Sequence, residues 1–139
     1  MSAFESDPVV KAVRAWADQA AKTVNSGHYT DKALQALMTP ALAKTMKNIL
    51  GGVVGQHFPG PLPFTPISTK QLANNQRELR GCLQTNGFGL DPKTGKPAHK
   101  RVVSAFYGDA VRSGGIWKVS ALDHGSFSCT GVRIPEVKW

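Results

Sequence analysis

Two adjacent residues near the end of the chain, Asp123 and His124, carry the side chains best suited to proton transfer, and Tyr107 precedes them as a candidate hydrogen-bond donor. A carboxylate or an imidazole held against a substrate can act as a general acid or base. Because successive residues of a strand point to opposite faces, only one of Asp123 and His124 can face an interior site. The alternative, which we favour, is that the pair begins a turn before Gly125 and lies in solvent.

The other candidate motifs predict neither a metal nor a cofactor. His28, His57 and His99 have no second ligand at a spacing that a metal site would need. The glycine-rich stretch 51–55 lacks the Lys and the Ser or Thr that follow it in a phosphate-binding loop. We therefore expect no bound metal and no cofactor.

Cys82 and Cys129 are the only cysteines of the chain. Both fall in predicted sheet, and one disulfide between them would stabilise the fold by about 4 kcal/mol in the chain-entropy model. Two buried free thiols are the alternative. We favour the disulfide, because neither cysteine has the His or Cys neighbours of a metal or redox site.

Length and composition predict a single domain over residues 1–139, because 139 residues suffice for one core and not for two. Hydrophobic residues make up 41% and charged residues 19%, which is ordinary for a globular chain. The longest uncharged stretch, 48–69, is broken by prolines and glycines and cannot form a membrane-spanning helix. The first seven residues have neither the basic start nor the apolar run of a signal peptide, so we expect an exported form to be mature or trimmed.

The formal net charge is +8, and residues 70–139 hold 11 Lys and Arg against 5 Asp and Glu. Such an excess attracts nucleic acid or an anionic surface. The candidates for that contact are Arg77, Arg80, Lys100, Arg101 and Arg112. We do not favour nucleic acid, because no basic run and no aromatic-basic signature is present.

Apolar spacing predicts helices over about 8–50. Asp7 before Pro8 is typical of a helix start, and Val10, Val13 and Trp16 then recur at helical spacing as core positions. Asp31 and the Thr39-Pro40 pair can begin two shorter helices, the second ending at Gly51-Gly52.

The segment 51–66 reads as a proline-rich linker, in which Phe58 and Phe64 are candidates for a ligand or partner surface. From 67 to 134 the apolar period shortens, which predicts an antiparallel sheet. We expect strands near 67–73, 77–86, 100–113, 115–123 and 126–134. Helices followed by a meander of strands indicate an α+β fold.

This order of elements resembles the nuclear transport factor two-like superfamily, also called cystatin-like cone or SnoaL-like. The residues that carry the resemblance are 24–30, at the end of the first helix, and the hairpin 110–119. The resemblance covers nearly the whole chain. It implies N-terminal helices packed on a curved antiparallel sheet of four to six strands, with a pocket between them.

Three stretches, 81–83, 90–97 and 126–131, resemble uncharacterised secreted or membrane-anchored domains of actinobacteria. In those domains the cysteines that match Cys82 and Cys129 are placed to pair. The resemblance implies an extracytoplasmic location. A cytoplasmic, phage or plasmid-borne protein is the alternative.

Two functions follow from the resemblance. Our first hypothesis is a non-catalytic cone-fold domain for binding or assembly in the cell envelope, a conjugation system or a phage particle. We expect its own side chains to fill the pocket, and we expect a homodimer or a larger protein assembly. A small apolar ligand in the cone is the alternative to a filled pocket. The alternative is an isomerase or cyclase of SnoaL type, for which the resemblance implies Asp123, His124 and Tyr107 as catalytic residues.

Overall fold

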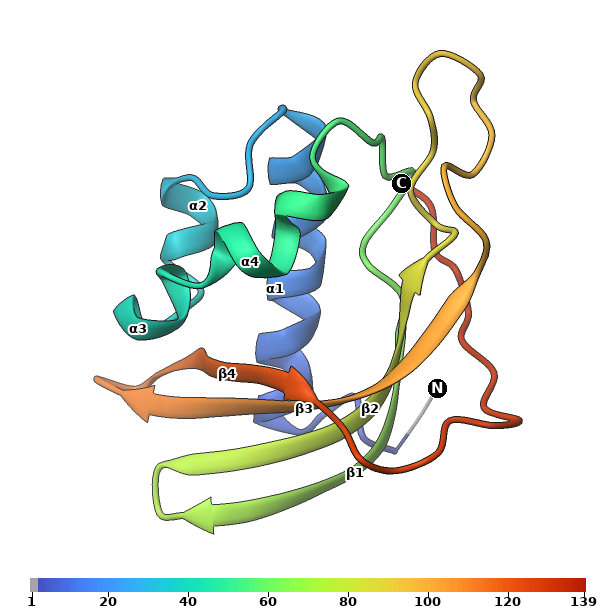
Figure 1. Ribbon diagram of the computed structural model, residues 1–139. Coiled ribbons are helices and arrows are strands. Elements are labelled where there is room, and N and C mark those ends of the chain that lie inside the picture. The colour runs from blue at the N-terminus through green and yellow to red at the C-terminus, as the bar shows by residue number, and fades with distance from the viewer. Residues whose placement is uncertain (1–2) are drawn as a thin grey trace.

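The computed structural model describes residues 3–139 and confirms the α+β architecture, with helices on one face of a curved antiparallel sheet (Figure 1). The long helix α1 (Pro8–Asn25) is followed by α2 (Lys32–Gln35), α3 (Pro40–Ala43), α4 (Met46–Leu50) and the 3-10 turn η1 (Gly51–Val53). The strands are β1 (Phe64–Ala73), β2 (Gln76–Asn86), β3 (Val102–Ser113) and β4 (Ile116–His124). They pair in the order β1-β2-β3-β4, each antiparallel to the next.

The start of α1 is fixed to the sheet through one carboxylate. Asp7 accepts a hydrogen bond from the Val9 amide at 3.1 Å, which caps the helix. The same carboxylate binds Arg77 of β2 at 2.7 and 3.0 Å and Thr69 of β1 at 2.8 Å. These contacts hold the helix axis over the sheet.

The short helices close the other side of the core. Asp31 caps α2 by accepting from the Leu34 amide at 2.8 Å, and Thr39 caps α3 by accepting from Leu42 at 3.4 Å. Each helix then buries apolar side chains against α1 or the sheet, the largest being Leu34, Leu42, Met46 and Leu50. The helices therefore form a layer over one face of the sheet.

Bulges bend the sheet around this layer. The pairing of β3 with β4 shifts so that Ala110 faces Val119 while Asp109 faces Ala121, which leaves Ser120 as an extra residue. Similar shifts occur in the β1–β2 and β2–β3 pairs. Because a bulge increases the local twist and bend, the sheet becomes a curved wall with its concave side toward the helices.

The predicted linker 51–66 extends too far at its C-terminal end, because β1 begins at Phe64 and includes Pro66. Proline is tolerated there since β1 is an edge strand of the sheet. The strand expected over 126–134 is wrong, because these residues form no strand. They do not continue the meander beside β4, whose outer edge is hydrogen-bonded at Val119 to the Leu37 and Thr39 backbone.

Residues 125–139 instead run as an extended segment along the β1 side of the sheet (Figure 1). The expected disulfide is confirmed: Cys129 is bonded to Cys82 of β2, with a Cα–Cα distance of 5.8 Å. Beyond it, Ile134 is buried and the Arg133 carbonyl accepts from Thr65 at 2.6 Å. We call residues 125–139 the tail segment.

The outer edge of β1 is the exposed edge of the sheet, and its bulge positions Ile67 and Leu72 are 39% and 42% exposed. The homodimer expected for an open sheet stays a prediction.

None of the helices in residues 3–139 is long and apolar enough to cross a membrane.

Candidate functional site

A pocket of about 300 Å³ lies between the helical layer and the concave face of the sheet. Helix α1 forms one wall, α4 a second, and β2, β3 and β4 the floor. Most of the side chains around it are apolar: Val13, Trp16, Ala17, Ile49, Phe64, Leu83, Ala105, Phe106 and Leu122. The expectation that the protein's own side chains fill the cone is therefore wrong, because the curved sheet leaves space beside α1.

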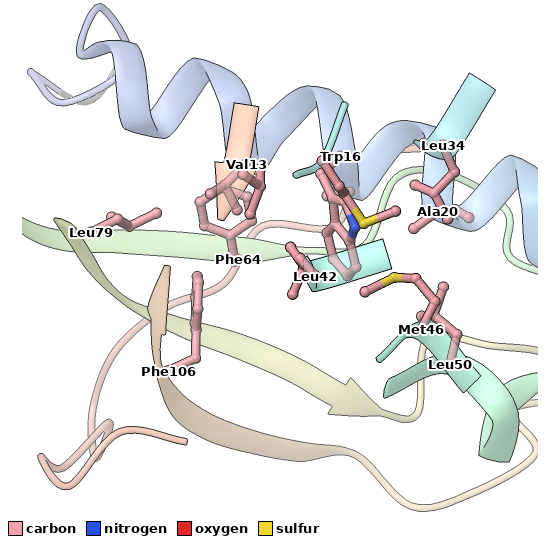
Figure 2. Packing of buried hydrophobic residues seen from close by; sticks show 14 of the residues in the cluster. Val13, Trp16, Ala20, Leu34, Leu42, Met46, Leu50, Phe64, Leu79 and Phe106 are labelled. Carbon is pink, nitrogen blue, oxygen red and sulfur yellow. The ribbon is translucent and has the colours of Figure 1, made fainter. Parts of the chain in front are cut away.

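Two aromatic rings shape the floor of the pocket. Phe64 and Phe106 meet edge to face, with ring centroids 5.6 Å apart and an interplanar angle of 86° (Figure 2). Phe106 can lie across the sheet because its neighbour on β2 is Gly81. A Cβ at Gly81 would stand 2.6 Å from a Phe106 ring carbon, closer than atoms can pack. This glycine therefore sets the position of the floor.

Trp16 lines the pocket and carries a deeply buried polar atom. The side chain comes from α1 on the same side as Val13 and Ala20 (Figure 2), and the residue is only 4% exposed. The indole Nε1 is buried and has no hydrogen-bond partner within residues 3–139. A buried donor without a partner costs about 1–3 kcal/mol. An acceptor that entered the pocket and reached this N–H would recover that energy.

The rim of the pocket is polar. Asn48 of α4, Thr85 of β2 and His124 of β4 are all exposed and all border it. Ser104 lies between the rim and the floor on β3 and is partly buried. The arrangement is an apolar interior with one buried donor and a polar opening, as small-molecule sites usually have.

The structure separates the proton-transfer residues that the sequence suggested. His124 pairs with Phe106 across β3 and β4, so it shares the concave face with the pocket. Asp123 pairs with Tyr107, so its side chain points to the outer face, although the residue is among those that border the pocket. The Tyr107 hydroxyl is hydrogen-bonded to Ser126 Oγ at 3.1 Å, and its ring packs on Phe127.

His124 thus stands alone on the pocket side. Within the described residues no carboxylate is hydrogen-bonded to His124. Among residues 3–139, Asp123 is the one acidic residue that lines the pocket, and its side chain faces away. A general base needs a second group that orients it or a donor for the developing charge. The pocket holds neither in contact with His124.

The outer face carries an acidic group of residues instead. Burial raises the pKa of Asp109, and the negative charges of Glu78 and Asp123 raise it further, while a hydrogen bond from Gln76 acts in the opposite sense. Lys70 and Arg80 approach Glu78 at 3.8 and 3.7 Å. Across residues 3–139 no group of three His, Cys, Asp or Glu is placed to hold a metal ion.

Phe58 and Phe64, suggested by the sequence as a surface, are buried, at 4% and 2% exposure. Phe58 packs on Phe88, and its amide and carbonyl are both hydrogen-bonded to Asn25. Phe64 lines the pocket, with the Arg14 guanidinium 3.9 Å from its ring centroid. Both belong to the interior because the linker folds against α1 rather than along the surface.

The basic residues suggested as a surface do not share one. Arg77 is bound to Asp7, while Arg80 lies on the other face of β2 over the Tyr107 ring. Arg101 and Arg112 are exposed at opposite ends of β3.

Sequence reasoning placed Trp16 in the core and missed its polar role. Its spacing on α1 is that of any core residue, and only the folded structure shows that the indole nitrogen lacks a partner. Gly81 likewise gave no signal, because the ring that needs its space is 25 residues away in β3.

A second hollow, of about 550 Å³, lies between the proline-rich segment and the tail segment. Three charged residues, Glu5, Arg14 and Arg133, line it. Arg14 is already bound to Glu5 at 2.8 Å and to the Phe64 carbonyl at 2.9 Å, and Arg133 is exposed.

Comparison with known proteins adds little about function. No protein-family model matches the chain, and no curated protein matches it. One solved structure with a similar course of the chain is described as an "Ntf2 like protein involved in plasmid conjugation", with 8% sequence identity and a TM-score of 0.47. The match covers 91% of this chain and 41% of that one, so this chain spans less than half of that protein. The actinobacterial resemblance stays a prediction.

Proposed function

We propose that this chain is a non-catalytic binding domain whose concave pocket takes a small, mostly apolar molecule carrying one hydrogen-bond acceptor. The observation that supports this most strongly is that Trp16 lines an apolar pocket and that its indole N–H is buried without a hydrogen-bond partner among residues 3–139. Burial of that donor lowers stability unless something accepts from it.

The size of the pocket sets the size of the ligand. A protein cavity of about 150 Å³ holds one benzene ring, so a pocket of about 300 Å³ suits a bicyclic or similarly compact molecule. The apolar body would lie between Phe64, Phe106 and Ile49, and the acceptor would reach Trp16. A polar substituent can extend between Asn48 and His124 into solvent.

We favour binding over catalysis because of the placement of the titratable groups. Of the three residues that an isomerase would use, only His124 is on the pocket side, and it has no hydrogen-bonded carboxylate. Asp123 and Tyr107 are on the other face of the sheet. Proton transfer inside the pocket would therefore depend on His124 alone, with no donor in contact with it for the developing charge.

Two probes that differ only in a carbonyl oxygen test this proposal. Indanone and indane have the same bicyclic carbon frame, and only indanone offers an acceptor. Titration calorimetry should show saturable binding of both, with indanone tighter by on the order of tenfold because it satisfies the buried donor. In Trp16→Phe, which keeps an aromatic ring and removes the N–H, the two probes should bind equally.

Trp117→Phe is the matched control, since Trp117 packs against the core and does not line the pocket. It should leave the preference for indanone unchanged. Absence of saturable binding of either probe to the wild-type protein would contradict a ligand pocket. An equal preference for indanone in wild type and Trp16→Phe would contradict the role of the indole.

We also propose a location in the cell envelope. It is supported by the Cys82–Cys129 disulfide, because disulfides persist in oxidising compartments and are rare in the cytosol. Cells lysed in a thiol-alkylating reagent should yield the protein with both cysteines unmodified. Full alkylation of Cys82 and Cys129 under denaturing, non-reducing conditions would place the protein in a reducing compartment.

A further inference from the structure

The connection between β2 and β3 is the most protruding part of the molecule and stands clear of both layers (Figure 1). We call residues 91–101 the basic loop. It carries four constitutive cations, Lys93, Lys96, Lys100 and Arg101, all exposed, against one carboxylate, Asp91. These residues supply a net +3 of the +8 of the whole chain.

The backbone of the basic loop is held in place although its side chains are exposed. The Asp91 amide donates to the Lys96 carbonyl at 2.8 Å, and the Gly95 amide to the Asp91 carbonyl at 2.7 Å. At the base, the Ala98 amide donates to the Gly89 carbonyl at 3.0 Å. Leu90 exchanges two hydrogen bonds with His57, which fixes the loop to the segment below. The cations are therefore presented on an ordered support.

The four cations of the basic loop form no ion pair among residues 3–139. Asp91 accepts from the Lys93 amide at 2.8 Å, so the single carboxylate stabilises the turn. Elsewhere cations do find partners, as Lys22 does with Asp18 at 2.9 Å.

We propose that the basic loop docks the domain on a membrane surface that contains anionic phospholipid. Three of its four cations are lysines, which act as compact point charges and suit a surface of phosphate headgroups. Base stacking on single-stranded nucleic acid needs exposed aromatic rings, and residues 91–101 include no Phe, Tyr or Trp. A protruding tip also reaches a flat surface before the rest of the domain does.

Co-sedimentation with lipid vesicles tests this docking. The wild-type protein should bind vesicles of equimolar phosphatidylglycerol and phosphatidylcholine and should not bind pure phosphatidylcholine. Each cation removed should weaken binding roughly fivefold, so replacing all four with glutamine should cost on the order of a hundredfold or more. Added salt should weaken wild-type binding, because exposed charges are screened.

A control variant on the helical side has the same net charge as the variant that lacks the four loop cations. Lys11, Lys32, Lys44 and Lys47 are exposed on the helical side, and their replacement by glutamine also removes four charges. This variant should retain most of the vesicle binding. Equal losses in the two variants would overturn the proposal, since the total charge would then account for binding. Absence of vesicle binding together with loop-dependent binding of a DNA oligonucleotide would also overturn it, in favour of nucleic acid.

Discussion

Reduction of the Cys82–Cys129 disulfide should lower the free energy of unfolding by about 4 kcal/mol. The two cysteines are 47 residues apart in sequence, and the chain-entropy expression gives this value at room temperature for a loop of that length. Reduction leaves both sulfur atoms in place, so no cavity contributes to the change. The bond also anchors the tail segment, because beyond Cys129 few backbone hydrogen bonds join it to the sheet.

Urea unfolding followed by tryptophan fluorescence measures the change, with and without a reductant. Cys82→Ala/Cys129→Ala serves as the control, because its stability should not respond to the reductant. Limited trypsin digestion should also cleave the reduced protein sooner at Arg133, which is exposed in the tail segment. A loss below about 1 kcal/mol, with unchanged cleavage, would refute the chain-entropy reasoning for this bond.

Three further changes test the packing and charges around the site. Asp7→Ala removes the cap of α1 and leaves Arg77 half-buried without its partner, so unfolding in urea should show a loss of about 2 kcal/mol. Burial acts to raise the pKa of Asp7, but the hydrogen bonds from Arg77, Thr69 and the Val9 amide and the charge of Arg77 together hold it below its ordinary value. The contribution of Asp7 is therefore present above about pH 4 and is lost as pH falls through the lowered pKa. Asp109→Asn should act in the opposite sense: because the pKa of Asp109 is raised, its charge destabilises the fold at neutral pH, and the variant should gain on the order of 0.5 kcal/mol there. Thermal melts at falling pH should show that gain disappear once the wild-type carboxyl is protonated; a gain that persists in acid would show that charge is not its cause. Gly81→Ala should push the Phe106 ring toward the pocket and destabilise the protein by about 1–3 kcal/mol, with weaker indanone binding in calorimetry; unaltered binding would mean that Phe106 does not form the floor.

The elements of this fold could be predicted where local chemistry decides them. The cap and proline at Asp7-Pro8, the helical spacing of Val10, Val13 and Trp16, and the turn chemistry between the strands each depend on neighbours in sequence. The disulfide could be favoured by elimination, because only two cysteines are present.

What the sequence could not predict depends on contacts distant in the chain. Residues 126–134 have strand-like composition, yet they do not pair beside β4, where the backbone at Leu37 and Thr39 is bonded to Val119. Phe58 and Phe64 lie among prolines and read as exposed, yet α1 covers them.

The candidate site shows the same division. Adjacent Asp123 and His124 could be assigned to opposite faces from strand geometry alone, and the pairing of His124 with Phe106 decides which of them faces the pocket. The pocket itself arises from bulges, such as that at Ser120, which the sequence does not mark.

The central claim is that Trp16 donates to a ligand in the concave pocket, and the indole N–H resonances test it most directly. The chain has three tryptophans, so three resonances are expected, and the one missing in Trp16→Phe belongs to Trp16. On titration with indanone that resonance should move downfield and saturate, while that of Trp139, whose Nε1 already donates to Asp18 at 3.1 Å, stays in place. A Trp16 resonance that does not respond to indanone at saturation would contradict the account.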